Sequence, residues 1–267
     1  MPRAIACLQI LIVALLAACG QPAATRAPVQ SAIDAAATYS PGEAGAILAR
    51  ARRLLDQTPA LMPGYVGAGI ACSSCHLAGG TQTTALPLLG AYAKYPQFNA
   101  RAHRYIALQD RIAECFLYSL NGRVPAYDST EMVVLTTYIA WLSRGAVVGT
   151  GFTEVTMPMV TRTAPADAGS GKGLYTARCS MCHGVNGTGI APAIPPIWGP
   201  KSFNTGAGMY RTDMLASFVR ANMPPGGSET LSEQQALDVA AYILRQPRPR
   251  FRGAAPQIFE PEPAKFF

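Results

Sequence analysis

The sequence lacks both a long apolar run and a recognisable nucleic-acid-binding motif. Its N-terminal apolar stretch, residues 5–18, is shorter than the roughly 20 residues that cross a bilayer as a helix. The formal net charge of +7 is too small to imply nucleic acid, and no pattern of aromatic and basic residues accompanies it. Such a modest basic excess suits a small anion or an acidic protein partner. These absences argue against a membrane-spanning protein and a nucleic-acid-binding protein.

Histidine is also scarce, and its placement is informative. Only three histidines are present, and two of them directly follow a Cys-x-x-Cys pair. The two motifs consist of Cys72, Cys75 and His76, and of Cys179, Cys182 and His183. In this pattern each thiol adds to a vinyl group of a porphyrin, and the adjacent imidazole ligates the iron. A zinc site that joins the two cysteine pairs is the main alternative, but it leaves both adjacent histidines unexplained. The sequence therefore predicts two covalently bound haem c groups.

The N-terminus resembles an export signal. Arg3 precedes the apolar stretch, which ends in Leu16-Ala17-Ala18-Cys19-Gly20, similar to a bacterial lipobox. We expect residues 1–18 to be a lipoprotein signal peptide, Cys19 to be lipidated, and residues 19–39 to form a flexible tether. The alternative is ordinary cleavage near Ala18, which leaves Cys19 as a plain thiol. The prediction is a periplasmic protein anchored to a membrane by lipid, with inner and outer membrane both open.

The repeated motif and the loop-rich composition predict two small helical domains. The chain contains 25 glycines and 22 prolines, as expected for long loops between few helices. We predict an all-α fold of two cytochrome c-like domains, each with one covalently bound haem. The domains are expected at 40–145 and 167–246, with a linker at 146–166 and a Pro-rich tail at 247–267. Helices are expected from Ser40 to about Thr58, over 108–120, from Asp128 to Gly145, and over 171–182, 212–222 and 232–246, with neither helix nor strand at 77–100.

Each haem iron needs a second ligand, and the sequence offers few. Of the seven cysteines, Cys7 is expected to be removed with the signal peptide, Cys19 is the expected lipidation site, and four attach the haems. Cys115 is the one that remains. It is either a distal thiolate for the first haem or a small buried apolar residue. His103 is the runner-up, although the arginines around it favour a surface position. For the second haem we expect Met223, with Met209 as the alternative, and core packing is the competing role for both.

Several short motifs resemble the dihaem thiosulfate dehydrogenases over about residues 60–245. They are Tyr65-Val66-Gly67, Asp110-Arg111-Ile112-Ala113-Glu114-Cys115, Asn121-Gly122-Arg123, Trp198-Gly199-Pro200 and Gly206-Ala207-Gly208-Met209. The resemblance implies an active-site haem ligated by His76 and Cys115, and a second, electron-transferring haem ligated by His183 and Met223. It also implies that Arg101, Arg111 and Ser119 bind the substrate anion. Some members have a lysine before the distal methionine that can exchange as a ligand. Here Asn222 stands in that position, which argues against such an exchange.

The reaction that the resemblance implies is oxidation of thiosulfate to tetrathionate, with electrons leaving to an external acceptor such as a small cytochrome c. The reverse reaction is the same chemistry, and the sequence does not fix the direction. Independently of the resemblance, the spacing of four between Arg111, Cys115 and Ser119 places all three on one helix face. The alternatives are a non-catalytic, lipid-anchored dihaem electron carrier and a dihaem peroxidase with a displaceable distal ligand.

Overall fold

The computed structural model describes residues 39, 41–153, 155–226 and 230–251. The expected signal peptide, the lipidation site Cys19 and the tail beyond Phe251 lie outside the described residues. Among the helices of the described part, none is both long and apolar enough to cross a membrane.

The first lobe contains most of the short elements. In chain order they are α2 (Glu43–Asp56), α3 (Thr58–Leu61), the 3-10 turn η1 (Cys72–Ser74), α4 (Leu77–Gly80), the 3-10 turn η2 (Tyr92–Lys94), β1 (Gln97–Asn99), β2 (Arg104–Ile106), α5 (Leu108–Glu114), the π-helical turn η3 (Cys115–Ser119) and α6 (Thr130–Trp141). Helix α2 begins later than predicted, because Gly42 precedes it with a left-handed φ of 99° that a helix cannot contain. Helix α6, expected from Asp128, begins at Thr130, because Ser129 is the N-cap residue and accepts a hydrogen bond from the Met132 amide.

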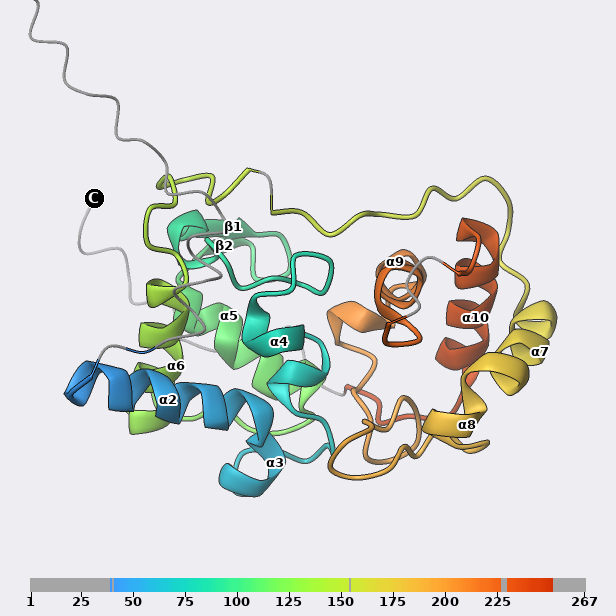
Figure 1. Ribbon diagram of the computed structural model, residues 1–267, viewed down its shortest axis with the longest axis horizontal. Helices are drawn as coiled ribbons and strands as arrows, with labels where there is room; N and C mark the ends of the chain where they lie inside the picture. Colours follow the sequence, from blue (N-terminus) through green and yellow to red (C-terminus); the bar gives the residue numbers. More distant parts are fainter. Residues whose placement is uncertain (1–38, 40, 154, 227–229, 252–267) are drawn as a thin grey trace, which may run out of the picture.

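The second lobe is built from α7 (Ala168–Arg178), α8 (Ser180–His183), the 3-10 turn η4 (Gly208–Tyr210), α9 (Thr212–Asn222) and α10 (Glu233–Arg245). Helix α10 packs against both α7 and α9. Its start lies where the helix was expected to begin and is fixed by a capping box, since Ser232 and Gln235 exchange hydrogen bonds between side chain and backbone. The approach of α7 to α10 requires Gly171, where a Cβ atom would lie 1.9 Å from the carbonyl oxygen of Asp238. The two lobes lie side by side, and an extended segment runs between them along one edge (Figure 1).

A small antiparallel sheet departs from the expected purely helical fold. Strands β1 and β2 pair with Phe98 opposite Tyr105, and the two rings meet edge to face with centroids 5.7 Å apart. Sequence periodicity did not predict these strands because three residues are too few to show alternation. The fold is otherwise mostly helical, as predicted.

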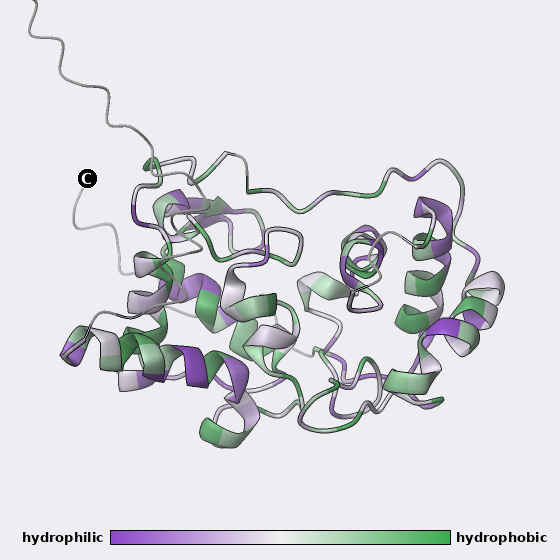
Figure 2. Cartoon of the chain, viewed as in Figure 1, coloured by the Kyte–Doolittle hydropathy of each residue, from purple (hydrophilic) through white to green (hydrophobic). Residues whose placement is uncertain are grey.

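Buried apolar side chains of both lobes form the core. The helices carry both hydrophobic and hydrophilic residues along their ribbons (Figure 2). Fully buried residues include Leu55 and Tyr138 in the first lobe and Tyr175 and Leu237 in the second. The lobes are also joined by backbone hydrogen bonds, from the Gly69 amide to the Lys201 carbonyl (2.8 Å) among others. Such bonds fix the two lobes against each other and bring residues of both to a shared boundary.

Candidate functional site

The first Cys-x-x-Cys-His motif lies between α3 and α4, with its histidine held by backbone. Nδ1 of His76 lies 2.5 Å from the carbonyl oxygen of Leu86. A carbonyl can only accept, so Nδ1 carries the proton and Nε2 presents its lone pair, as a metal-ligating histidine requires. Burial lowers the pKa of His76 and so keeps the ring neutral. The amide of Cys72 is fixed by a 3.0 Å hydrogen bond to the Thr58 hydroxyl.

The second motif repeats this arrangement around an apolar pocket. Nδ1 of His183 lies 3.3 Å from the Pro195 carbonyl oxygen, and burial lowers the pKa of this histidine as well. Both predicted methionines, Met209 and Met223, line the pocket beside His183. The other lining side chains include Cys179, Cys182, Phe203, Leu215, Phe218 and Val239.

The side chains available at both motifs fit a covalently bound haem better than a zinc ion. Each motif offers two thiols and a neutral imidazole beside apolar side chains, which is what a covalently attached porphyrin requires. No group of three or more histidine, cysteine or acidic side chains in the described residues is arranged to hold a metal ion. Ser74 and Cys75 of the first motif also line the pocket of the second motif. The two candidate haem sites therefore adjoin each other.

Cys115 begins the π-helical turn that continues α5. The Leu120 amide donates to the Cys115 carbonyl oxygen at 2.9 Å, a bond that spans five residues. Single π turns inside helices occur frequently at functional sites. Burial raises the pKa of the Cys72 thiol to about 11 and that of Cys75 to about 12, and in both cases an electrostatic interaction with Cys115 adds to the effect. Cys115 thus lies near the cysteines of the first motif.

Arg111 lies one helical turn before Cys115 and interacts with it electrostatically. The pKa of Arg111 is raised above its ordinary value, first by its electrostatic interaction with Cys115 and further by Glu114, against the effect of burial. Its Nη1 atom donates to Oε2 of Glu114 at 3.0 Å. Arg111 is therefore placed to stabilise a negative charge beside the first motif.

A polar pocket of about 300 Å³ brings together Arg101, Arg111 and Ser119. The structure thus brings together the three residues that the resemblance implies for anion binding, and their binding role stays a prediction. Cys115 does not line this pocket, but its neighbour Glu114 does, as does Arg111, whose pKa Cys115 raises. Arg211 of the second lobe also lines the pocket, and it pairs with Asp213 at 2.7 Å. Sequence reasoning missed Arg211, because nothing in the sequence placed the two lobes relative to each other.

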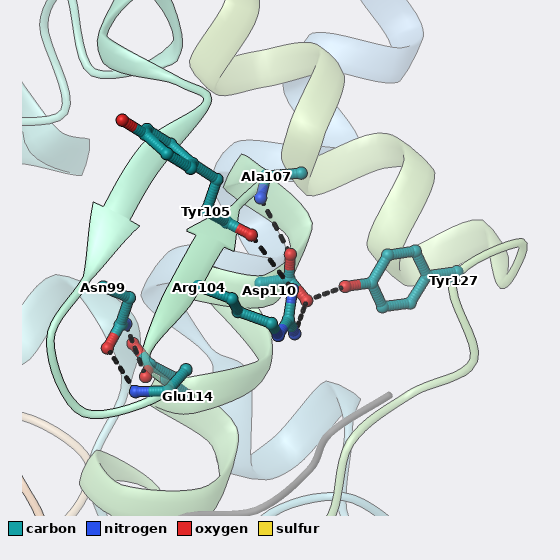
Figure 3. Close-up of polar contacts among 8 residues, drawn as sticks. Asn99, Arg104, Tyr105, Ala107, Asp110, Glu114 and Tyr127 are labelled. Carbon is teal, nitrogen blue, oxygen red and sulfur yellow. Dashed lines mark hydrogen bonds and ion pairs between the residues drawn. The ribbon is translucent and has the colours of Figure 1, made fainter. Parts of the chain in front are cut away.

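Hydrogen bonds to the carboxylates of Glu114 and Asp110 fix the wall of the pocket. Asn99 on β1 donates to Oε1 of Glu114 at 2.9 Å, which ties the sheet to α5 (Figure 3). The buried carboxylate of Asp110 accepts from Arg104, from Tyr127 and from the Ala107 amide at the start of α5 (Figure 3). These contacts fix the helix end that carries Arg111.

Arg101 is held by contacts from both lobes. Its Nη1 atom donates to the Gly206 carbonyl oxygen at 2.9 Å, and its guanidinium lies 4.3 Å from the ring centroid of Tyr118. His103, the runner-up ligand, is exposed in the turn between β1 and β2. The flanking arginines led us to expect such a position on the surface.

Known proteins match this architecture along nearly the whole described chain. Residues 66–148 match the family described as SoxA/TsdA, cytochrome c domain, and residues 168–246 match the cytochrome c family. The two lobes are thus two cytochrome c domains. A thiosulfate dehydrogenase of Allochromatium vinosum is 42% identical over 229 residues, which is 82% of this chain and 85% of that protein. One from Stutzerimonas stutzeri is 36% identical, covering 77% of this chain and 69% of that protein.

Among solved structures, the as-isolated thiosulfate dehydrogenase TsdBA of Marichromatium purpuratum matches with a TM-score of 0.73 and 34% identity. The match covers 80% of this chain and 48% of the solved chain, so this chain spans about half the length of that protein. The chain belongs to the dihaem thiosulfate dehydrogenase family. Its two cytochrome c domains account for the two covalently bound haem c groups that the sequence predicts.

Proposed function

We propose that this protein is an enzyme that oxidises two thiosulfate ions to one tetrathionate ion at the first motif. The observation that carries the proposal is the convergence of Arg101, Arg111 and Ser119 in one pocket, with Arg111 also interacting with Cys115. In the reaction a sulfur–sulfur bond forms and two electrons are released to an external acceptor. Two dianions must approach each other, and guanidinium groups lower their repulsion while matching the geometry of their oxygens.

His76 and Cys115 are the proposed iron ligands at the first motif, and His183 and Met223 those at the second, with Met209 as the second candidate. Bound haem would supply the one-electron acceptor chemistry that the side chains themselves lack. Support for the assignment comes from the Nδ1 contacts of both histidines and from the position of Met223 in the second pocket. Ser119 and the two arginines would hold the substrate oxygens, and Arg111 would stabilise the Cys115 thiolate.

We propose further that electrons leave through the second domain to a soluble acceptor such as a small cytochrome c. The proposed location is the periplasm, with a lipid anchor on Cys19. The lipobox-like sequence supports the anchor, and mass spectrometry of the mature N-terminus tests it: an unmodified Cys19 would refute it. The second candidate function is a lipid-anchored dihaem electron carrier, in which Cys115 has no catalytic role.

The test compares thiosulfate-dependent ferricyanide reduction by the wild type, by Cys115→Gly and by a control variant, Arg50→Gln. Arg50 forms a surface ion pair with Glu131 at 3.5 Å, outside the pocket. We expect full activity in the control and a loss of at least about a hundredfold in Cys115→Gly, comparable to removal of a transition-state stabilising group. Equal rates in all three proteins would refute the catalytic role of Cys115. If the wild type shows no thiosulfate-dependent rate, the electron-carrier function is favoured.

Electron paramagnetic resonance tests the ligation of iron by Cys115 separately, since a thiolate-type low-spin signal should be present in the wild type and missing in Cys115→Gly.

A further inference from the structure

Asn222 is a buried polar residue at the boundary between the two domains, and all of its side-chain hydrogen-bonding groups have partners. It is the last residue of α9 and only 4% exposed. Its Oδ1 atom accepts from Nε2 of Gln82 at 2.7 Å and from the hydroxyl of Thr84 at 2.9 Å. Its Nδ2 atom donates to the carbonyl oxygens of Thr84 and Phe218, both at 2.9 Å. An amide can make about four such bonds, so this one is saturated.

On the first-domain side, the partners of Asn222 belong to the loop that holds the histidine of the first motif. Gln82 and Thr84 lie between His76 and Leu86, whose carbonyl oxygen receives the Nδ1 proton of His76. Gln82 also donates to the Thr84 hydroxyl at 3.3 Å, which ties the two partners to each other. A shift of this loop would therefore act on the imidazole and on Asn222 together.

On the second-domain side, Asn222 directly precedes Met223. The Met223 amide still donates to the Val219 carbonyl oxygen of α9 at 2.9 Å, so the methionine backbone continues from the helix end that Asn222 fixes. The Met223 side chain lines the pocket of the second motif. Two residues of the first domain thus form hydrogen bonds with the residue directly before Met223, which is proposed as a haem ligand in the second domain.

We propose that Gln82, Thr84 and Asn222 form an interdomain clamp that positions Met223 for the second haem and couples it to the histidine loop of the first. This inference rests on the proposed assignment of Met223 as distal ligand. Buried polar groups are costly to leave without partners, and a satisfied network selects one arrangement over its alternatives. Asn222 is in this view a positioning residue, and its amide is already used by the clamp.

The test changes the first domain and measures the second haem in the purified, haem-loaded protein. Thr84→Val removes the hydroxyl that bonds Asn222, and Thr84→Ser keeps it. The matched control is Thr81→Val, because the Thr81 hydroxyl donates to the nearby Ala78 carbonyl oxygen at 2.9 Å and forms no hydrogen bond with Asn222. The readouts are the weak long-wavelength absorption band of ferric methionine-ligated haem and the midpoint potential of the second haem.

For Thr84→Val we expect about a tenfold larger fraction of haem without its methionine ligand, equivalent to about 1.4 kcal/mol. Thr84→Ser should restore the band, and Thr81→Val should leave the band and the potential unchanged. A wild-type band and potential in Thr84→Val would overturn the clamp, as would an equal change in Thr81→Val. The assignment of Met223 is tested apart from the clamp by Met223→Ala, which should abolish the band. If Met223→Ala keeps the band, the ligand assignment fails and the clamp loses its stated role. Thiosulfate oxidation is measured separately and decides only the proposed function.

Discussion

Arg101→Gln should reduce thiosulfate oxidation without removing either haem. The guanidinium lines the polar pocket and is held there by the Gly206 carbonyl oxygen and the Tyr118 ring. A hydrogen bond to a charged group contributes about 1.5–3 kcal/mol, so its loss should lower kcat/KM by roughly tenfold to a hundredfold. Arg101→Lys keeps the charge but loses the planar fork that matches an oxyanion, so its loss should be smaller but still measurable.

The assay is the initial rate of ferricyanide reduction over a range of thiosulfate concentrations, which separates kcat from KM. Because salt screens the attraction between the pocket and a dianion, the wild-type KM should rise with ionic strength, and Arg101→Gln should show a weaker dependence. Arg50→Gln removes one positive charge outside the pocket and serves as control. Absorption spectra must match the wild type, since Arg101 also contacts the second domain. If kcat/KM of Arg101→Gln equals that of Arg50→Gln, the pocket is not the substrate site.

Three further predictions concern the pocket and the packing. Arg211→Gln should raise KM for thiosulfate by several-fold through loss of a pocket charge, and an unchanged KM would exclude Arg211 from substrate binding. Tyr118→Phe should leave the thermal midpoint unchanged or raise it, because the buried hydroxyl has no partner among the described residues; a clear decrease would show that this hydroxyl does have one. Gly171→Ala should destabilise the second domain by about 1–3 kcal/mol in urea unfolding, since the new methyl group would overlap the Asp238 carbonyl. Gly173→Ala on the same helix meets no atom within 4 Å and should not destabilise it, and equal effects would refute the packing argument.

The sequence predicted those features of the structure that are determined by residues close together in the chain. The Cys-x-x-Cys-His motifs, the cap at Ser232 and the apolar faces of the long helices all act over a few positions, and the structure places them accordingly. Arg111 and Ser119, eight residues apart, both line the pocket although a π turn replaces the α-helix between them, whereas Cys115, expected on the same helix face, does not line it. The predicted start of α2 at Ser40 was wrong, because the left-handed backbone of Gly42 delays the start of the helix to Glu43.

Features that depend on tertiary contacts could not be predicted in the same way. The π turn at Cys115 forms no pattern that distinguishes it from an α-helix in sequence. Besides its backbone pairing, the β1–β2 sheet is stabilised by one aromatic pair and by the bond from Asn99 to Glu114, neither of which has a sequence signature. The contribution of Arg211 to the pocket exists only because of the relative position of the two domains. Sequence thus predicted the residues around the first motif and missed those that the second domain adds.

The domain boundary is therefore part of the candidate site as well as a connection between two electron-transfer units. The Gly206 carbonyl oxygen that holds Arg101 belongs to a loop anchored by Asn204, which is 1% exposed and donates its amide protons to the Leu117 carbonyl oxygen and the Asn121 side chain. The same asparagine accepts the Gly206 amide at 2.8 Å. Because the Leu117 carbonyl lies within the π turn that Cys115 begins, one buried side chain links the turn to the loop that holds the arginine. The proposed substrate pocket consequently requires both domains in their observed arrangement, and each domain alone would lack part of it.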